Sequence, residues 1–136
     1  MFGDIIIPFN SVLLYNVCKL KENHSFEEVE LAIGKTCTLT KDMDGFIAGQ
    51  VVKYAGFVSE EGTVGDPRNI GVVGNHFGLL TYWESSDAHE KSHKDQATKD
   101  AFEKVLEVCE QTYELGYEIQ WQSDNISNGN GERWNT

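Results

Sequence analysis

The sequence predicts one α+β domain whose elements follow the order strand, helix, strand, strand, helix, strand. Capping boxes at residues 25–28 and 87–90 mark the starts of two helices. Short segments with the apolar and polar patterning of strands stand before, between and after these helices. This order is the split βαβ, or ferredoxin-like, arrangement, in which a four-stranded antiparallel sheet carries two helices on one face.

Local signals give the expected boundaries of these elements. The strands are expected at residues 11–20, 46–54, 73–83 and 117–122, and the helices at 25–41 and from 87 to about 112. The first helix should end at the run 42–45, which finishes in Gly45. In the third strand, alternation places Phe77 and Trp83 on one face and Leu80 and Tyr82 on the other, so both faces should be substantially covered.

Residues 55–72 and the C-terminal residues depart from this pattern. The segment 55–72 is rich in glycine and charged residues and has neither helical nor strand periodicity, so it is predicted to be a long loop insertion. Residues 123–136 are rich in asparagine, serine and glycine and are predicted to form a disordered tail. The domain is therefore expected to span residues 1–122.

Two helices on one face would leave the other face of the sheet bare. A partly apolar bare face is usually buried against a second copy of the chain. We therefore expect a homodimer, or a higher homo-oligomer, built as a dimeric α+β barrel. The cavity between the two sheets of that assembly would hold a small-molecule ligand.

The acidic composition excludes several classes of partner. The chain has 11 basic and 22 acidic residues, a formal net charge of −11. Such a charge repels phosphate backbones and anionic lipids, which argues against nucleic-acid or membrane-surface binding. The N-terminal residues form neither a signal peptide nor a spanning helix, so a cytoplasmic location is expected.

Three widely spaced cysteines argue against a disulfide framework. Cys18 and Cys109 lie within apolar patterns and are interpreted as small buried side chains. Cys37 lies on the first predicted helix and is a candidate for a chemical role.

The run His89-Glu90-Lys91-Ser92-His93 carries the strongest chemical signal in the sequence. Residues four apart lie on one face of a helix, so both imidazoles can reach one metal ion. The alternative is that both rings lie on the solvated first turn of the helix. In either case Asp87 is interpreted as a helix cap and Glu90 as a capping or supporting residue.

The same run matches the His-Glu-x-x-His motif of zinc peptidases, but its context does not. The charged Lys91 would have to be desolvated in the buried helix of such an enzyme. No glycine-histidine extension follows the motif, and the predicted fold has no substrate cleft beside a strand. A peptidase is therefore disfavoured.

The chain from about Val12 to Trp121 resembles the sulfur oxygenase/reductase family of mononuclear non-heme iron enzymes. One likeness is the first helix, with Gly34-Lys35-Thr36-Cys37 followed by Asp44-Gly45-Phe46, where aspartate replaces the family's proline. The second is Leu80-Thr81-Tyr82-Trp83 with the His-x-x-x-His helix, and the third is Tyr117-Glu118. The family's chains are much longer and repeat the ferredoxin-like unit, whereas this chain offers one unit.

This resemblance implies an iron site and a reactive thiol. His89, His93 and Glu118 would bind the iron, with zinc as the less favoured metal, and Cys37 would hold sulfur as a persulfide. Two imidazoles and one carboxylate leave coordination positions open for oxygen or substrate. The resemblance thus implies oxygen-dependent oxidation of a sulfur compound or another small molecule.

Two other functions fit the same predicted fold. The frame also resembles the antibiotic-biosynthesis monooxygenase superfamily, whose members often need no metal. Under that interpretation His76, Tyr82 and Trp83 line an apolar chamber, and the histidine pair is incidental. The third possibility is a non-catalytic dimeric binding module.

Overall fold

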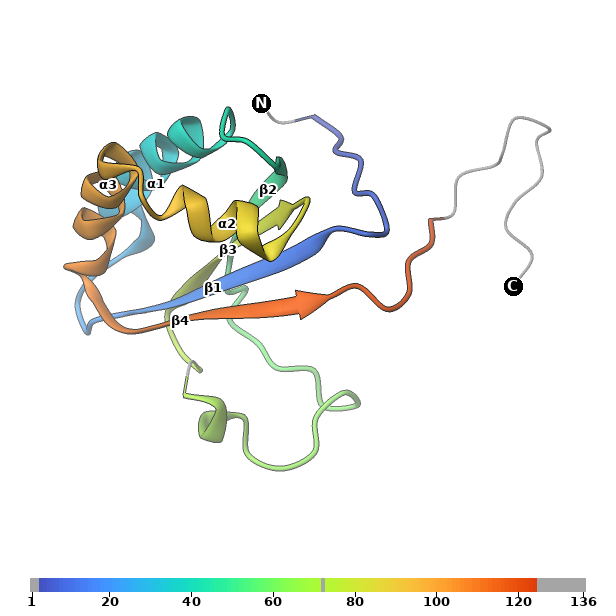
Figure 1. The fold of residues 1–136 in the computed structure, drawn as a ribbon. Helices are drawn as coiled ribbons and strands as arrows, with labels where there is room; N and C mark the ends of the chain where they lie inside the picture. The colour runs from blue at the N-terminus through green and yellow to red at the C-terminus, as the bar shows by residue number, and fades with distance from the viewer. Residues whose placement is uncertain (1–2, 72, 125–136) are drawn as a thin grey trace.

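A computed structural model of the chain describes residues 3–71 and 73–124 (Figure 1). The predicted disordered tail lies outside the described residues from residue 125 onward, so its disorder stays a prediction. None of the described helices is both long enough and apolar enough to cross a membrane.

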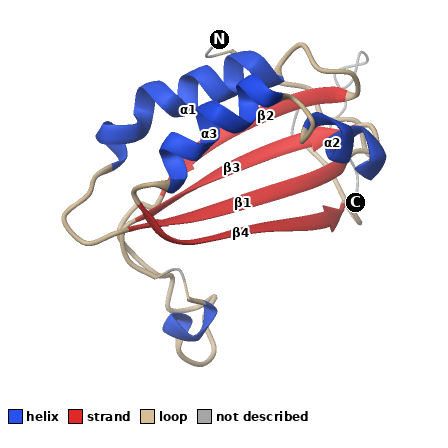
Figure 2. Ribbon diagram, turned by 60° about the vertical axis from the view of Figure 1, so that its left-hand side comes forward, coloured by secondary structure: helices blue, strands red, loops and turns tan. Residues whose placement is uncertain are grey.

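The core of the fold is one antiparallel sheet of four strands. The strands are β1 (Val12–Leu20), β2 (Phe46–Lys53), β3 (His76–Trp83) and β4 (Cys109–Glu118). Their order across the sheet is β2-β3-β1-β4, and every neighbouring pair is antiparallel. This arrangement confirms the predicted α+β, split βαβ topology (Figure 2).

The helices α1 (Phe26–Thr40), α2 (Ser86–Ser92) and α3 (Gln96–Leu106) cover one face of this sheet (Figures 1 and 2). The predicted capping box at the start of α1 is present, with Ser25 and Glu28 each satisfying a backbone amide of the first turn. A short 3-10 helix, η1 (Pro67–Ile70), lies in the long loop between β2 and β3.

The prediction of a single helix from residue 87 to 112 is wrong, because two polar side chains start separate helices. The N-cap of α2 is Ser85, whose hydroxyl accepts a hydrogen bond from the Ala88 amide at 3.1 Å, and not Asp87. Asp95 then caps α3 by accepting bonds from the amide and the hydroxyl of Thr98, at 2.9 and 2.6 Å. A side chain that offers its own acceptor to the backbone in this way competes with helix continuation.

The fourth strand begins eight residues earlier than predicted. It runs from Cys109 to Glu118, where the prediction placed it at 117–122. The helical spacing of the apolar residues Ala101, Val105 and Val108 accounts for the prediction of one helix that continues past Cys109. In the structure α3 ends at Leu106, and the residues from Cys109 onward pair with β1.

The hydrophobic core lies between the sheet and helices α1 and α3. Its buried side chains are Cys18, Leu20, Val29, Ile33, Phe77, Leu79 and Val105. The Phe26 ring packs edge-on against Phe77, with ring centroids 5.4 Å apart. All three cysteines are free thiols in the structure, and Cys18 and Cys109 lie in or against this core.

None of the described helices covers the opposite face of the sheet (Figure 2). Alternation along β4 places Tyr113, Leu115 and Tyr117 on this face, and each is between 41 and 46% exposed. We call this surface the uncovered face.

Substitutions of two glycines by alanine are expected to change the free energy of unfolding in opposite directions. Gly45 has a φ of +82°, and a Cβ there would come 2.5 Å from the Cβ of Ala88 in α2. Gly45→Ala is therefore expected to lower the free energy of unfolding by about 1–3 kcal/mol.

Gly34 lies within α1 with no atom near the position of a Cβ, so Gly34→Ala should raise that free energy by about 0.5–1 kcal/mol. Urea denaturation at one protein concentration measures both, and equal signs would contradict the contrast between the two sites.

Candidate active site

A cavity of about 470 Å³ lies between the helices and the sheet. Residues of β1, β3 and β4 form its floor, and residues of α1, α2 and α3 form its walls. Its apolar part comes from Leu14, Leu79, Trp83, Phe102 and Leu106. The volume suits a small organic molecule.

His89 lies on α2 and is buried, with 5% of its surface exposed. The edge of its ring meets Trp83 of β3, with centroids 5.5 Å apart. The Ser92 hydroxyl donates a hydrogen bond to the His89 carbonyl and supports the end of the short helix. The ring is therefore fixed in one orientation between helix and sheet.

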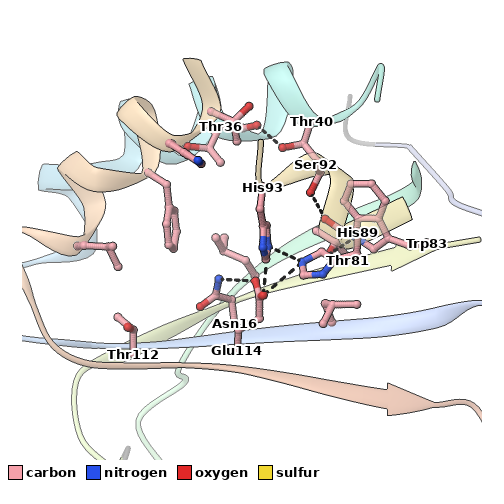
Figure 3. A pocket seen from close by; sticks show the side chains of 16 residues that line it. Asn16, Thr36, Thr40, Thr81, Trp83, His89, Ser92, His93, Thr112 and Glu114 are labelled. Atoms are coloured by element: carbon pink, nitrogen blue, oxygen red, sulfur yellow. Dashed lines mark hydrogen bonds and ion pairs between the residues drawn. The ribbon is translucent and has the colours of Figure 1, made fainter. Parts of the chain in front are cut away.

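His93 follows one helical turn later, and its ring also enters the cavity (Figure 3). The Nε2 atoms of His93 and His89 are 3.1 Å apart, and the ring planes make an angle of 79°. The prediction that residues four apart would bring both imidazoles to one point is confirmed. His93 is about half exposed, so it is the ring that a ligand can reach.

Glu114 of β4 completes a compact cluster with the two imidazoles. Its Oε1 atom lies 3.3 Å from Nε2 of His89 and 3.4 Å from Nε2 of His93. Asn16 donates a hydrogen bond to the other carboxylate oxygen at 3.3 Å. The hydrogen bond with His89, together with the charges of both histidines, holds the pKa of the Glu114 carboxyl below its usual range, against a smaller opposing effect of burial.

Glu90 approaches the opposite nitrogens of the same two rings. Its carboxylate oxygens lie 3.7 Å from Nδ1 of His89 and 3.7 Å from Nδ1 of His93. These distances are ion-pair contacts and exceed a hydrogen bond. The prediction that Glu90 would be a supporting residue fits this position, and each imidazole therefore lies between two carboxylates.

The structure brings Glu114, and not the predicted Glu118, to the histidine pair. Glu114 is opposite Asn16 in the sheet, whereas Glu118 is opposite Val12 at the end of β4 and is exposed. Four residues along a strand correspond to about 13 Å. The alternation of Tyr113, Leu115 and Tyr117 with polar or small residues was the sequence signal for a strand through Glu114.

Cys37 is not brought to the cluster. It lies on α1 beside Thr36, which lines the cavity, but Cys37 itself is exposed and does not line it. The protein atoms that surround the thiol raise its pKa by desolvation. A nucleophilic thiol needs the opposite shift, so the structure adds no activation to Cys37.

Three hydroxyl groups around the cavity have already committed their hydrogens. Thr36 donates to the Ala32 carbonyl, Thr40 to the Thr36 carbonyl and Ser92 to the His89 carbonyl. These oxygens can therefore offer a ligand lone pairs as acceptors (Figure 3).

The alternative set of lining residues is placed on two different faces. Trp83 lines the cavity and donates from its indole nitrogen to Thr81 at 2.8 Å. Tyr82 points to the uncovered face, where its hydroxyl donates to Gln50 at 3.2 Å. His76 stacks on Tyr54, also away from the cavity. Of these predicted residues, only Trp83 can contact a ligand there.

His89, His93 and Glu114 are also the residues that could hold a metal ion. One ligand atom from each lies within 4.8 Å of the others, and the part of the chain that the structure describes contains no second group of this kind. Imidazoles and carboxylates serve equally as metal ligands and as acid–base groups. The geometry alone therefore does not separate the two uses.

Neither the models of known protein families nor the curated proteins contain a match to this sequence. The fold has matches among solved structures. A cofactor-independent oxygenase from Streptomyces nogalater, SnoaB, is 11% identical with a TM-score of 0.62, over 83% of this chain and 96% of that one. A dimeric protein of unknown function from Thermobifida fusca is 8% identical with a TM-score of 0.61, over 86% of this chain and 100% of that one, and is described as ferredoxin-like. The chain has a ferredoxin-like fold.

A third structure with this ferredoxin-like fold is a putative antibiotic biosynthesis monooxygenase from Deinococcus radiodurans. It is 14% identical, with a TM-score of 0.58 over 85% of this chain and 97% of that one. These comparisons contradict the prediction of an iron cofactor, or of zinc in its place, because the chain is similar to an oxygenase that is described as cofactor-independent. None of these three structures is a sulfur oxygenase/reductase, so that resemblance stays a prediction from sequence.

Proposed function

We propose that this protein is a homodimeric, cofactor-independent oxygenase that acts on a small organic molecule with an acidic C–H bond. The observation that carries this proposal is the cluster of His89, His93 and Glu114, whose facing atoms lie 3.1 to 3.4 Å apart in a largely apolar cavity. The likeness in fold to cofactor-independent and antibiotic-biosynthesis oxygenases supports it.

In this proposal His93 is the general base, because its ring is both in the cavity and accessible. The Glu114 carboxylate, ionised at neutral pH because its pKa is lowered, stabilises the imidazolium that forms when His93 takes a proton. His89 donates to the same carboxylate and holds it in place. Glu114 and His89 are thus positioning residues.

The chemistry balances without a bound cofactor or an external reductant. Removal of a proton from a substrate CH₂ group gives a carbanion, which transfers electrons to O₂. One oxygen atom then forms the new C=O bond, and the other leaves as water with the two substrate hydrogens. Apolar side chains on the cavity walls would limit the contact between the reactive anion and bulk water.

The proposal that sulfur is oxidised through Cys37 has less support. It requires a thiol in the cavity, and Cys37 is exposed and outside the residues that line the cavity. A C–H acid needs only groups that the cavity contains. We therefore favour the carbon substrate.

The homodimer is proposed to form through the uncovered face. This face exposes Tyr113, Leu115 and Tyr117, and apolar surface of this kind is commonly buried between subunits. The likeness in fold to a protein that is described as dimeric supports the homodimer.

Oxygen uptake with anthrone, an aromatic ketone that carries an acidic methylene group, tests the activity. Protein dialysed against EDTA is expected to consume one O₂ for each molecule of anthrone that is oxidised to the quinone. Activity that disappears on metal removal and returns with added metal would contradict a cofactor-independent reaction. No uptake with anthrone or related aromatic C–H acids, together with tight binding of them, would favour the non-catalytic binding module.

A further inference from the structure

The long connection between β2 and β3, residues 54–75, leaves the sheet on the side away from the helices, as Figures 1 and 2 show. We call this connection the arm. None of its described residues lines the cavity, which lies on the helical side. The arm therefore lies apart from the candidate active site, and the site does not account for it.

Local hydrogen bonds give the arm a defined backbone. The Thr63 hydroxyl donates to the Ser59 carbonyl, and Asp66 caps η1 by accepting from the Arg68 amide at 3.0 Å. The Arg68 guanidinium also donates to both carboxylate oxygens of Asp66, at 2.8 to 3.0 Å. The arm is thus a structured extension of the β2–β3 hairpin.

The base of the arm is attached to the uncovered face. Tyr54 stacks on His76, with ring centroids 4.6 Å apart. Gly71 lies against β4, where a side-chain carbon in its place would come 3.0 Å from the Tyr113 hydroxyl and 3.1 Å from Oε1 of Gln111. The arm and the uncovered face therefore form one continuous surface.

This structured arm carries large apolar side chains that no other part of the described chain covers. Phe57 is 72% exposed, Val64 103% and Ile70 71%, and Val58 adds a further 42%. Ordered apolar side chains held in water in one segment are typical of a surface that another molecule covers.

The distribution of charge favours a second copy of this chain as the molecule that covers the arm. The chain carries a net charge of −11, so two copies repel each other except where their surfaces lack carboxylates. At the positions of the four strands that alternate onto the uncovered face, the one charged residue is Lys19, which pairs with Glu110 near the sheet end at 4.0 Å. The strand positions of this face carry no unpaired carboxylate, which in so acidic a chain suits a second copy of the same chain. The acidic residues of the arm are Glu60, Glu61 and Asp66, and Asp66 pairs with Arg68.

We propose that the arm packs against a second copy of this chain and clasps it across the dimer interface. The inference rests on the proposed homodimer and not on the proposed oxygenase activity. Each subunit would then bury Phe57 and Ile70 of its own arm against the other subunit, beyond the area that the two sheets contribute.

Sedimentation equilibrium of the full chain tests this directly. The double variant Phe57→Ser/Ile70→Ser is expected to raise the dimer Kd by about 100-fold, since two apolar anchors are lost at about tenfold each. The matched control is Leu31→Ser, which replaces a 90% exposed leucine on α1 and should leave the Kd unchanged. Circular dichroism checks that each variant is folded.

The possible results of these experiments distinguish a failure of the arm proposal from a failure of the proposed dimer or of the proposed activity. A wild-type monomer overturns both the dimer and the arm proposal. If Leu115→Arg on the uncovered face breaks the dimer while the arm variant dimerises normally, only the arm proposal is overturned. Oxygen uptake, measured separately, bears on neither.

A photo-crosslinker identifies what the arm touches. A benzophenone side chain at position 64 is introduced into a mixture of isotopically light and heavy chains. Crosslinked peptides that join light to heavy chains are expected, and crosslinks confined to single chains would show that the arm folds back on its own subunit and would overturn the proposal.

Discussion

His93→Gln is expected to lower oxygen uptake with anthrone by about 10²- to 10⁴-fold, the usual contribution of a general base. Glutamine approximates the size and polarity of the imidazole but cannot accept a proton at neutral pH. The cavity should still bind substrate, because His93 forms only one part of its wall. The measurement is the initial rate of oxygen uptake over a range of substrate concentrations, so that kcat and KM are separated.

The matched control for this loss is His24→Gln. His24 is partly exposed near the start of α1 and hydrogen-bonds Glu28 at 2.8 Å, outside the cavity. Its replacement should leave kcat within about twofold, as expected for a surface change away from the reacting groups. Equal losses in both variants, or full activity in His93→Gln, would remove His93 from the role of base.

Phe77→Ala is expected to lower the free energy of unfolding by about 3–5 kcal/mol. Phe77 has no exposed surface and lies at the centre of the core, where Phe26 packs against its ring. Removal of the ring leaves a cavity that the sheet and α1 cannot close without moving. Denaturation in urea, followed by circular dichroism at one protein concentration, measures the loss.

Leu31→Ala provides the comparison, because Leu31 is 90% exposed on the outer side of α1. Its replacement should change the unfolding free energy by less than about 0.5 kcal/mol. A small effect of Phe77→Ala, or an equal effect of both substitutions, would mean that the core is not centred on Phe77.

The fold class could be predicted because it depends on the order of elements and not on their exact ends. The capping box at Ser25 and the alternation through Phe77 and Trp83 are local signals that the tertiary structure preserves. The division of the segment after β3 into α2 and α3 could not be predicted in this way. Asp95 has the same sequence character as a polar residue on an exposed helix face, and only its bonds to Thr98 show that it begins a new helix.

The site could be predicted where its geometry is local and not where it depends on strand register. His89 and His93 meet because they are one helical turn apart. Glu114 reaches them only because β4 pairs with β1 so that Glu114 lies opposite Asn16. Glu114 and Glu118 lie on the same face of β4, so the alternation of polar and apolar residues does not distinguish them. The pairing of β4 with β1 decides which of the two carboxylates lies beside the histidines.

The type of chemistry could not be predicted from the residue types alone. Two imidazoles and a carboxylate suit a divalent metal and also suit proton transfer, because both need lone pairs directed at one point. The prediction of iron followed from the resemblance in sequence pattern. The comparison of whole structures contradicts that prediction, because the chain is similar in fold to an oxygenase that is described as cofactor-independent.

The shortness of α2 has a consequence for how this fold can change. With seven residues, α2 is too short to be stable alone, and it depends on the Ser85 cap and on packing of His89 against Trp83. The core, by contrast, lies beneath α1 and α3. His89 and His93 therefore lie on or just after a helix that does not cover the core, so substitutions in α2 are expected to alter the site with little loss of the fold.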